Sequence, residues 1–161
     1  MASDNDTAQE SERPHLDVSA IREGTVIDHI QNEVTFKVAD ILSLDQEDRM
    51  VLVGMNLPSG KVGKKGLIKI AGRALTPQEV NKIALIAPDA TLNIIRDYTV
   101  AEKRRVELPE SVEGIVRCIN PNCITNQQPV TTSFEIMDSV PVALRCTYCE
   151  RTIGADDIIL K

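Results

Sequence analysis

GLIKIAGRALTPQEVNKIALIA, residues 66–87, joins a strand pattern to a helix pattern in one stretch. At its start Ile68 and Ile70 alternate with residues of the opposite face, as in a strand. Thr76-Pro77-Gln78-Glu79 is typical of a helix start, with Thr76 as N-cap, proline at the first helical position and Glu79 closing a capping box. The apolar residues that follow share one helical face, and Pro88 ends the helix: Val80, Ile83, Ala84 and Ala87.

Strand and helix patterns also flank this stretch. Residues 25–30 (TVIDHI) predict a short strand, and the next apolar positions share one face of a helix. Residues 50–57 predict a buried strand closed by a turn at 58–60, and residues 91–100, which carry Tyr98, predict a last strand. The order β-α-β-β-α-β predicts a ferredoxin-like α+β domain over residues 18–105, with both helices on one face of a single sheet. The apolar positions of the first helix are Val34, Val38, Ile41 and Leu42.

The two ends of the chain differ from this middle part. Residues 1–17 carry five acids against Arg13, and so polar a segment is expected to be disordered. Leu108-Pro109-Glu110-Ser111 suggests a linker over residues 106–113. Residues 114–161 contain short β-type runs, which predict a small all-β domain. A domain of fewer than 50 residues has only a small hydrophobic core, so we expect it to need additional stabilisation from a cross-link or a bound metal ion.

Composition narrows the class of protein. The 161 residues have a net charge of −6 and a pI near 5.0, which argues against a protein that coats nucleic acid. No apolar run approaches the roughly 18 residues of a transmembrane helix. The first residues are acidic where a signal peptide would be basic. We therefore expect a cytoplasmic protein, too short to be a large multidomain enzyme.

All four cysteines lie in the C-terminal part, as Cys118-x4-Cys123 and Cys146-x2-Cys149 separated by 22 residues. Two such pairs can bring four thiolates to the corners of a tetrahedron, as Zn²⁺ prefers. Two disulfides and a CxxC redox pair are the alternatives, but the first needs an oxidising compartment and the second leaves one pair without a role. The pattern favours one structural zinc ion, since four protein ligands leave no position open for catalysis.

Charge indicates which partners each part could bind. The cysteine-rich part, a predicted zinc ribbon, is slightly acidic, which favours a protein partner over nucleic acid; a stand-alone ribbon that binds nucleic acid or a transcription partner remains the alternative. Lysines and arginines gather instead near the central hairpin and after residues 91–100, which suggests an anionic ligand, although a solvated surface would look the same. These cations are Lys61, Lys64, Lys65, Lys69, Arg73, Lys103, Arg104 and Arg105.

Few residues look suited to catalysis. Residues 54–61 (GMNLPSGK) depart from a P-loop in spacing, and neither Ser nor Thr follows the lysine. Asp28 and His29 are adjacent, but neighbouring strand residues point to opposite faces, which disfavours a direct side-chain pair. A role in binding, with Asp28 on a sugar and His29 on a phosphate, suits them better. We find no credible active site.

Residues 18–160 resemble the regulatory chain of aspartate carbamoyltransferase. The stretches that carry the resemblance are residues 23–30 (EGTVIDHI), 56–60 (NLPSG), 67–70 (LIKI), 87–91 (APDAT), 118–123 (CINPNC) and 146–150 (CTYCE). The resemblance implies a non-catalytic subunit of a pyrimidine-biosynthesis enzyme. Its N-terminal domain would bind CTP as inhibitor and ATP as activator, with UTP as a possible third effector. Its zinc domain would hold the catalytic chains, and regulatory dimers would bridge two catalytic trimers.

The resemblance also implies the roles of particular residues. Asp28 would contact the ribose, His29 the phosphates, and Lys69 the base and sugar, while Lys103 would bind phosphate and ribose. The base would be bordered by Val18, Ala20 and Ile21. The far wall of the pocket would be lined by Asn93, Ile95, Tyr98 and Val100. The residues beside the cysteine pairs would contact the catalytic chain: Asn120, Asn122, Glu150 and Arg151.

Overall fold

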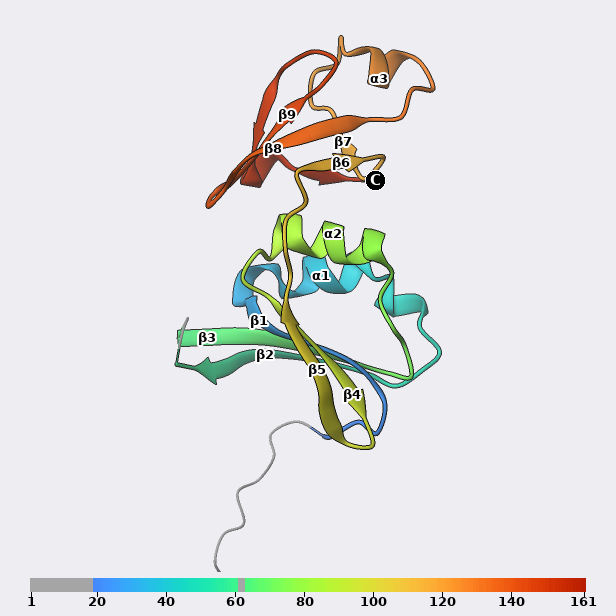
Figure 1. The fold of residues 1–161 in the computed structure, drawn as a ribbon, viewed down its shortest axis with the longest axis vertical. Coiled ribbons are helices and arrows are strands. Elements are labelled where there is room, and N and C mark those ends of the chain that lie inside the picture. Colours follow the sequence, from blue (N-terminus) through green and yellow to red (C-terminus); the bar gives the residue numbers. More distant parts are fainter. Residues whose placement is uncertain (1–18, 61–62) are drawn as a thin grey trace, which may run out of the picture.

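The computed structural model describes residues 19–60 and 63–161, so the acidic segment 1–17, Val18 and the tip of the central hairpin lie outside the described residues. Two units follow one another along the chain (Figure 1). The N-terminal unit contains β1 (Gly24–Gln31), η1 (Asn32–Val34), α1 (Thr35–Ile41), η2 (Leu44–Gln46), β2 (Val51–Ser59), β3 (Gly63–Ala71), α2 (Pro77–Ile86), β4 (Thr91–Arg96) and β5 (Thr99–Arg105). The C-terminal unit contains β6 (Ser111–Glu113), β7 (Val116–Arg117), α3 (Ile124–Gln127), β8 (Ser133–Ser139), β9 (Val142–Cys146), β10 (Thr152–Gly154), η3 (Ala155–Asp157) and β11 (Ile159–Leu160).

The N-terminal unit is built on an antiparallel sheet with the strand order β2-β3-β1-β4-β5. Its first four strands and two helices have the expected ferredoxin-like connectivity. The prediction of one last strand over residues 91–100 is wrong, because the chain reverses at Asp97 and Tyr98 and returns as β5. Both residues have positive φ, 47° and 63°, as a two-residue hairpin turn of type I′ requires. The sequence lacks the Asn-Gly or Asp-Gly pair that normally marks such a turn.

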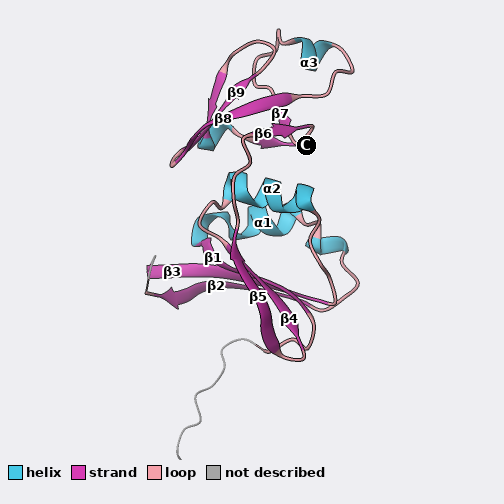
Figure 2. Ribbon diagram, in the orientation of Figure 1, coloured by secondary structure: helices cyan, strands magenta, loops and turns pink. Residues whose placement is uncertain are grey.

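Both helices cover one face of this sheet, as expected, and lie between the sheet and the C-terminal unit (Figures 1 and 2). The core beneath them is aliphatic and includes Ile27, Ile68, Ile70, Ile83 and Leu92. The capping box of α2 is confirmed, since the Thr76 hydroxyl accepts from the Glu79 amide and the Glu79 carboxylate accepts from the Thr76 amide. Among the described residues, no helix is long and apolar enough to cross a membrane.

The C-terminal unit is nearly all β, as predicted. A four-stranded sheet of order β10-β9-β8-β6 packs beside the short pair β11-β7. Its core combines a few large side chains, such as Phe134, Leu144 and Ile153, with three buried cysteines.

Residues 106–113, the predicted linker, make contacts with both units. Val106 is buried in the core under the helices, and Leu108 contacts both that core and the core of the C-terminal unit. Leu85 of α2 is itself buried in the second core, and the Lys82 ammonium donates to the carbonyl oxygen of Lys161 at 2.7 Å. Helix α2 therefore belongs to both units.

One glycine tests the packing of α1 on the sheet. A Cβ at Gly66 would overlap the Thr35 side chain, whereas a Cβ at Gly60 would meet no atom within 4 Å. We expect Gly66→Ala to lower the free energy of unfolding by about 1–3 kcal/mol, since such overpacking forces the backbone to move. Gly60→Ala should change it by less than about 0.5 kcal/mol. Urea unfolding followed by circular dichroism would measure both variants. Thr35→Ala should restore part of the loss in the Gly66→Ala background, and the absence of any rescue would contradict the packing proposed here.

Candidate functional site

The candidate site lies on the face of the five-stranded sheet opposite α1 and α2, here called the open face. Residues on this face form rows across β3, β1, β4 and β5, because directly paired residues project to the same side. One row is apolar, with Ala71, Gly24, Ile95 and Val100. The next holds Lys69, Val26, Asn93 and Lys103, and the third holds Asp28, Thr91 and Arg105. Successive rows lie about 7 Å apart along the strands.

A β-bulge in β1 shapes the charged end of the open face. Between Ile27 and Ile30 the strand has one residue more than its partner β3, and His29 adopts a left-handed φ of 56°. Its Nδ1 therefore lies 3.7 Å from a carboxylate oxygen of Asp28. The argument that strand alternation separates the two side chains is thus wrong, because the bulge interrupts the alternation.

Asp28 is the centre of a polar cluster. Lys65 Nζ lies 2.7 and 2.9 Å from its two carboxylate oxygens, and the backbone amide of His29 donates to one of them. Burial acts to raise the pKa of Asp28, but the hydrogen bonds from Lys65 and His29 outweigh it, so the pKa lies below its ordinary value. The Thr91 hydroxyl lies 3.3 Å from His29 Nδ1. The cluster is an ordered set of polar groups at the edge of a basic surface.

Lys69 links the open face to the start of the described chain. Its ammonium donates to the carbonyl oxygen of Ser19 at 2.7 Å. Burial lowers the pKa of Lys69, and the nearby Asp28 carboxylate offsets part of that effect.

The apolar end of the open face borders a cavity of about 590 Å³. Ile21, Val26 and Ile95 form a small buried cluster there, and the exposed ring of Tyr98 stands at the adjoining hairpin turn. Ala20 and Ile21, which were expected to border the base, and Tyr98, which was expected on the far wall of the pocket, all line this cavity.

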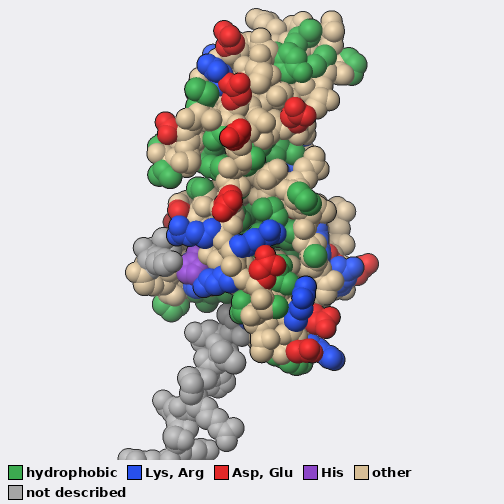
Figure 3. All heavy atoms as spheres, in the orientation of Figure 1, with side chains coloured by type: hydrophobic (Ala, Val, Ile, Leu, Met, Phe, Trp, Pro, Cys, Tyr) green, Lys and Arg blue, Asp and Glu red, His purple; other side chains and the backbone are tan. Residues whose placement is uncertain are grey.

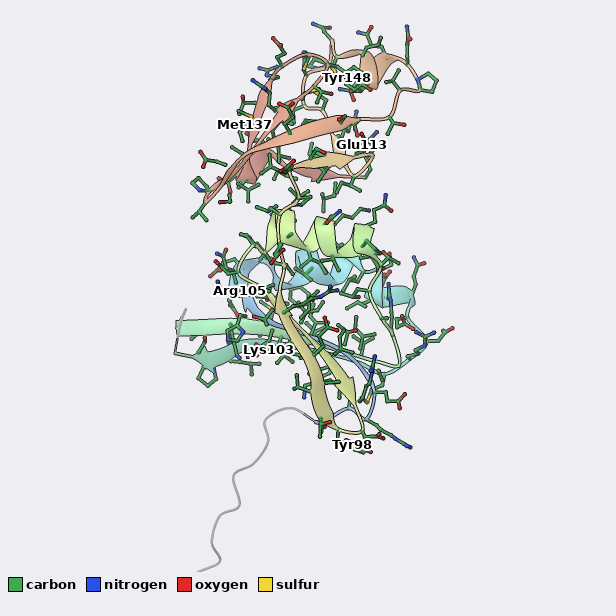
Figure 4. The ribbon with its side chains drawn as sticks, viewed as in Figure 1. Tyr98, Lys103, Arg105, Glu113, Met137 and Tyr148 are labelled. Carbon is green, nitrogen blue, oxygen red and sulfur yellow. The ribbon has the colours of Figure 1, made fainter. Side chains whose placement is uncertain are left out.

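The structure therefore brings the described residues of the expected pocket to one face of one sheet, with apolar groups at one end and charged groups at the other. Val18 lies outside the described residues. Figure 3 shows lysine and arginine side chains gathered on the N-terminal unit, and Figure 4 shows Lys103 and Arg105 on the same strand. Sequence reasoning left Lys65 and Arg105 out of the pocket. The sequence did contain a signal for them, because side chains two or four residues apart on a strand lie on the same face. By this rule Lys65 shares a face with Lys69, and Arg105 shares a face with Lys103.

A second site lies in the C-terminal unit, where the four cysteine sulfurs lie within 4.8 Å of one another. The sulfurs of Cys118 and Cys149 are 3.6 Å apart, and those of Cys123 and Cys146 are 3.8 Å apart. A tetrahedral ion with metal–sulfur bonds of about 2.3 Å has sulfur–sulfur edges of about 3.8 Å. The geometry and the thiol donors thus fit a single tetrahedral metal ion. Burial raises the pKa of Cys118 to about 12, so a cation is needed to hold its thiolate at neutral pH.

The loops around the cysteines are held by hydrogen bonds that nearby side chains donate. Asn126 donates to the carbonyl oxygens of Cys118 and Asn120, and the Thr125 hydroxyl donates to the sulfur of Cys123. Among the expected interface residues, Asn120 is half-buried and its side-chain oxygen accepts from the amide of Asn122. The other three are exposed beside the metal ligands: Asn122, Glu150 and Arg151.

The cluster at Asp28 predicts a stability that depends on pH. A carboxylate with a lowered pKa stabilises the fold above its unfolded-state pKa, and this contribution is lost as the pH falls through the folded-state value. Asp28→Asn should therefore cost about 1–3 kcal/mol at neutral pH, where it leaves the ammonium of Lys65 without its anion. In urea unfolding the gap between wild type and variant should narrow as the pH falls below about 5, and it should close only below the ordinary pKa of an aspartate, because the pKa of Asp28 is lowered in the folded state. In a Lys65→Gln background the gap at neutral pH should be smaller; an unchanged gap would contradict the pairing.

Comparison with known proteins covers both units. The family model "Aspartate carbamoyltransferase regulatory chain, allosteric domain" matches residues 16–107, and the model for the metal binding domain of the same chain matches residues 110–159. An aspartate carbamoyltransferase regulatory chain from Pyrococcus abyssi is 54% identical over 146 residues, which cover 89% of this chain and 96% of the relative. One from Porphyromonas gingivalis is 52% identical over 143 residues, 89% of this chain and 95% of the relative. The resemblance seen in the sequence is thereby confirmed, and this chain belongs to the family of aspartate carbamoyltransferase regulatory chains, non-catalytic subunits with an allosteric and a metal-binding domain.

Proposed function

We propose that the open face binds CTP as inhibitor and ATP as activator of aspartate carbamoyltransferase, with UTP as a further effector. The observation that carries the proposal is the change along one face from an apolar row to two rows that carry charge, with Lys69 and Lys103 in the second and Arg105 in the third. Lys65 and His29 lie beside Asp28 at this charged end. A nucleoside triphosphate has the same order of parts: a flat base, a ribose with hydroxyls, and a chain of phosphates. The ligand would lie along the strands, with its base at the apolar row.

Each row offers groups suited to one part of the ligand. The base would occupy the cavity beside Ala20, Ile21 and Tyr98, with Ile95 and Val100 as its apolar wall. Asp28, Asn93 and Lys69 would contact the ribose and the polar edge of the base. The phosphates would be held by charge-assisted hydrogen bonds, which are about twice as strong as neutral ones, from His29, Lys65, Lys103 and Arg105.

The neighbours Lys103 and Arg104 provide a matched test, because they project to opposite faces of β5. Lys103→Ala should weaken CTP binding about tenfold or more, since it removes a phosphate contact worth about 1.5–3 kcal/mol. Arg104→Ala, which removes an equal charge from the other face, should weaken it by less than about threefold. Calorimetric titration of the metal-loaded chain would measure both, followed by ATP in competition with CTP. Equal losses in the two variants would contradict the assignment to the open face, and the absence of any CTP binding to folded wild type would contradict the effector proposal itself.

We infer that the metal is one zinc ion with a structural role. The four sulfur donors and their spacing suit Zn²⁺, and four protein ligands leave no open position for a substrate. The ion would supply most of the folding energy of the C-terminal unit, whose own core is small.

The C-terminal unit would dock the catalytic chains, with Asn122, Glu150 and Arg151 at the contact and Asn120 holding the loop in shape. Their placement beside the metal supports a dependence of docking on the metal. Assembly of regulatory dimers with two catalytic trimers would take place in the cytoplasm.

The two edges of the five-stranded sheet suggest how a regulatory homodimer would form. The edge strand β5 carries one acid and three cations in succession, Glu102 to Arg105, which protect an edge from pairing. The other edge strand β2 has nine residues and no charge, and the side chain of Val53 is exposed on it. The edge at β2 therefore suits pairing with a second copy of the chain.

Removing the metal separates the roles of the two units. Treatment with a strong chelator should unfold residues 111–161 and abolish binding to a catalytic trimer, whereas the N-terminal unit should stay folded on its own aliphatic core. Hydrogen exchange read by mass spectrometry would follow each unit, and gel filtration would follow assembly. Metal analysis should give one zinc per chain in wild type and none in Cys118→Ser. Assembly by the metal-free chain would contradict the proposed docking role.

A further inference from the structure

The open face carries more positive charge than its own carboxylate can neutralise. Lys65, Lys103 and Arg105 share this face, and among the residues that the structure describes Asp28 is the acid within its rows. Lys103 and Arg105 are exposed, and Figure 3 shows lysine and arginine side chains gathered on the surface of the N-terminal unit. The chain has a net charge of −6, so this basic surface should attract an anionic segment electrostatically.

The chain itself contains such a segment. Residues 1–17 hold five of the chain's 24 acidic residues and a single arginine. Four of these acids precede residue 16, where the match to the allosteric-domain model begins: Asp4, Asp6, Glu10 and Glu12. The match to the allosteric-domain model therefore does not include these four acids.

The described chain starts at the basic surface. Ser19 accepts a hydrogen bond from Lys69, which lies in the middle row of the open face. Glu12 is seven residues before Ser19, a reach of up to about 23 Å, whereas Lys69 and Lys103 are separated by three strand spacings, about 14 Å. We propose that the acidic segment 1–17 docks on the open face of its own chain and competes there with polyanionic ligands.

This competition rests on the proposed nucleotide site, whereas the docking itself rests on charge and reach. A tethered segment has an effective concentration in the millimolar range, so even weak contacts occupy a measurable fraction of the face. A ligand must then displace the segment. Its apparent dissociation constant equals the intrinsic constant divided by the fraction of molecules in which the segment is not docked. Because the segment has carboxylates but no group that resembles a nucleobase, it would compete for the phosphate-binding side chains and weaken the binding of every nucleotide to the same extent.

Neutralising the segment tests the competition. We compare wild type with a variant carrying Asp4→Asn, Asp6→Asn, Glu10→Gln and Glu12→Gln. The control carries the same change in charge on exposed acids of the C-terminal unit: Glu113→Gln, Asp138→Asn, Asp156→Asn and Asp157→Asn. The probe is inorganic tripolyphosphate, followed by calorimetry in low salt.

The tail variant should bind tripolyphosphate about three- to tenfold tighter than wild type, and the control less than twofold tighter. The gap should narrow in about 0.5 M salt, because screening weakens contacts between exposed charges. Equal affinities for the tail variant and the control would overturn the competition. A parallel titration with CTP separates the two proposals. If the tail variant binds tripolyphosphate more tightly than wild type but neither protein binds CTP, the proposed nucleotide site is contradicted and the docking of the acidic segment still stands.

Cross-linking tests the docking without any ligand. A carbodiimide joins carboxylates to lysines in contact, and mass spectrometry identifies the joined peptides. In the wild-type chain, residues 1–17 should join Lys65, Lys69 and Lys103 of the open face in preference to Lys37 and Lys82 on the helices. An even distribution over both groups of lysines would overturn the docking. A mixture of isotopically light and heavy chains should give links within one chain; links mainly between chains would overturn docking on the same chain.

Discussion

The burial of one face of the five-stranded sheet by two helices is the constraint on which the rest of the structure depends. Ile27, Ile68 and Leu92 are almost fully buried beneath α1 and α2, and each apolar residue buried in this way contributes roughly 1.5–3 kcal/mol. Because side chains alternate along a strand, the neighbours of these residues are forced onto the other face. The position of Lys69 between Ile68 and Ile70 follows from that alternation.

The same alternation gives a physical route between the open face and the C-terminal unit. Lys69 and Ile68 are consecutive residues of one strand, so a ligand held by the first bears on the packing of the second against the helices. Helix α2 continues the route, since Ile83 is buried in the first core and Leu85 in the second. In the proposed regulatory role, a ligand on the open face would act on a bound partner only by binding two conformations of the assembly with different affinity, and α2 is the element that both cores share.

The parts of the fold that were predictable are those where local preference and tertiary packing agree. The capping box at Thr76 and Glu79 defines the start of α2 whatever surrounds it, and the alternation of Ile68 and Ile70 defines the inner face of β3. The cysteine spacing likewise predicted the clustered thiols, because two close cysteine pairs are typical of the four ligands of one metal ion. The missed strand β5 has every residue exposed, so it has no buried face to give a strand pattern.

The features that the sequence did not reveal are concentrated at the proposed nucleotide site. His29, Asp97 and Tyr98 all have positive φ, a conformation that costs a residue other than glycine about 1–3 kcal/mol where the surroundings hold it in place. Residues other than glycine seldom adopt a positive φ. A prediction from backbone preference therefore extends β1 through His29 as a regular strand, and it extends β4 through the turn before β5. Yet the bulge brings the imidazole of His29 to the carboxylate of Asp28, and the turn brings Lys103 and Arg105 beside the central strands. The basic surface exists because the backbone leaves its preferred conformation at these positions, and the interaction energy that maintains it comes from the packed sheet on either side.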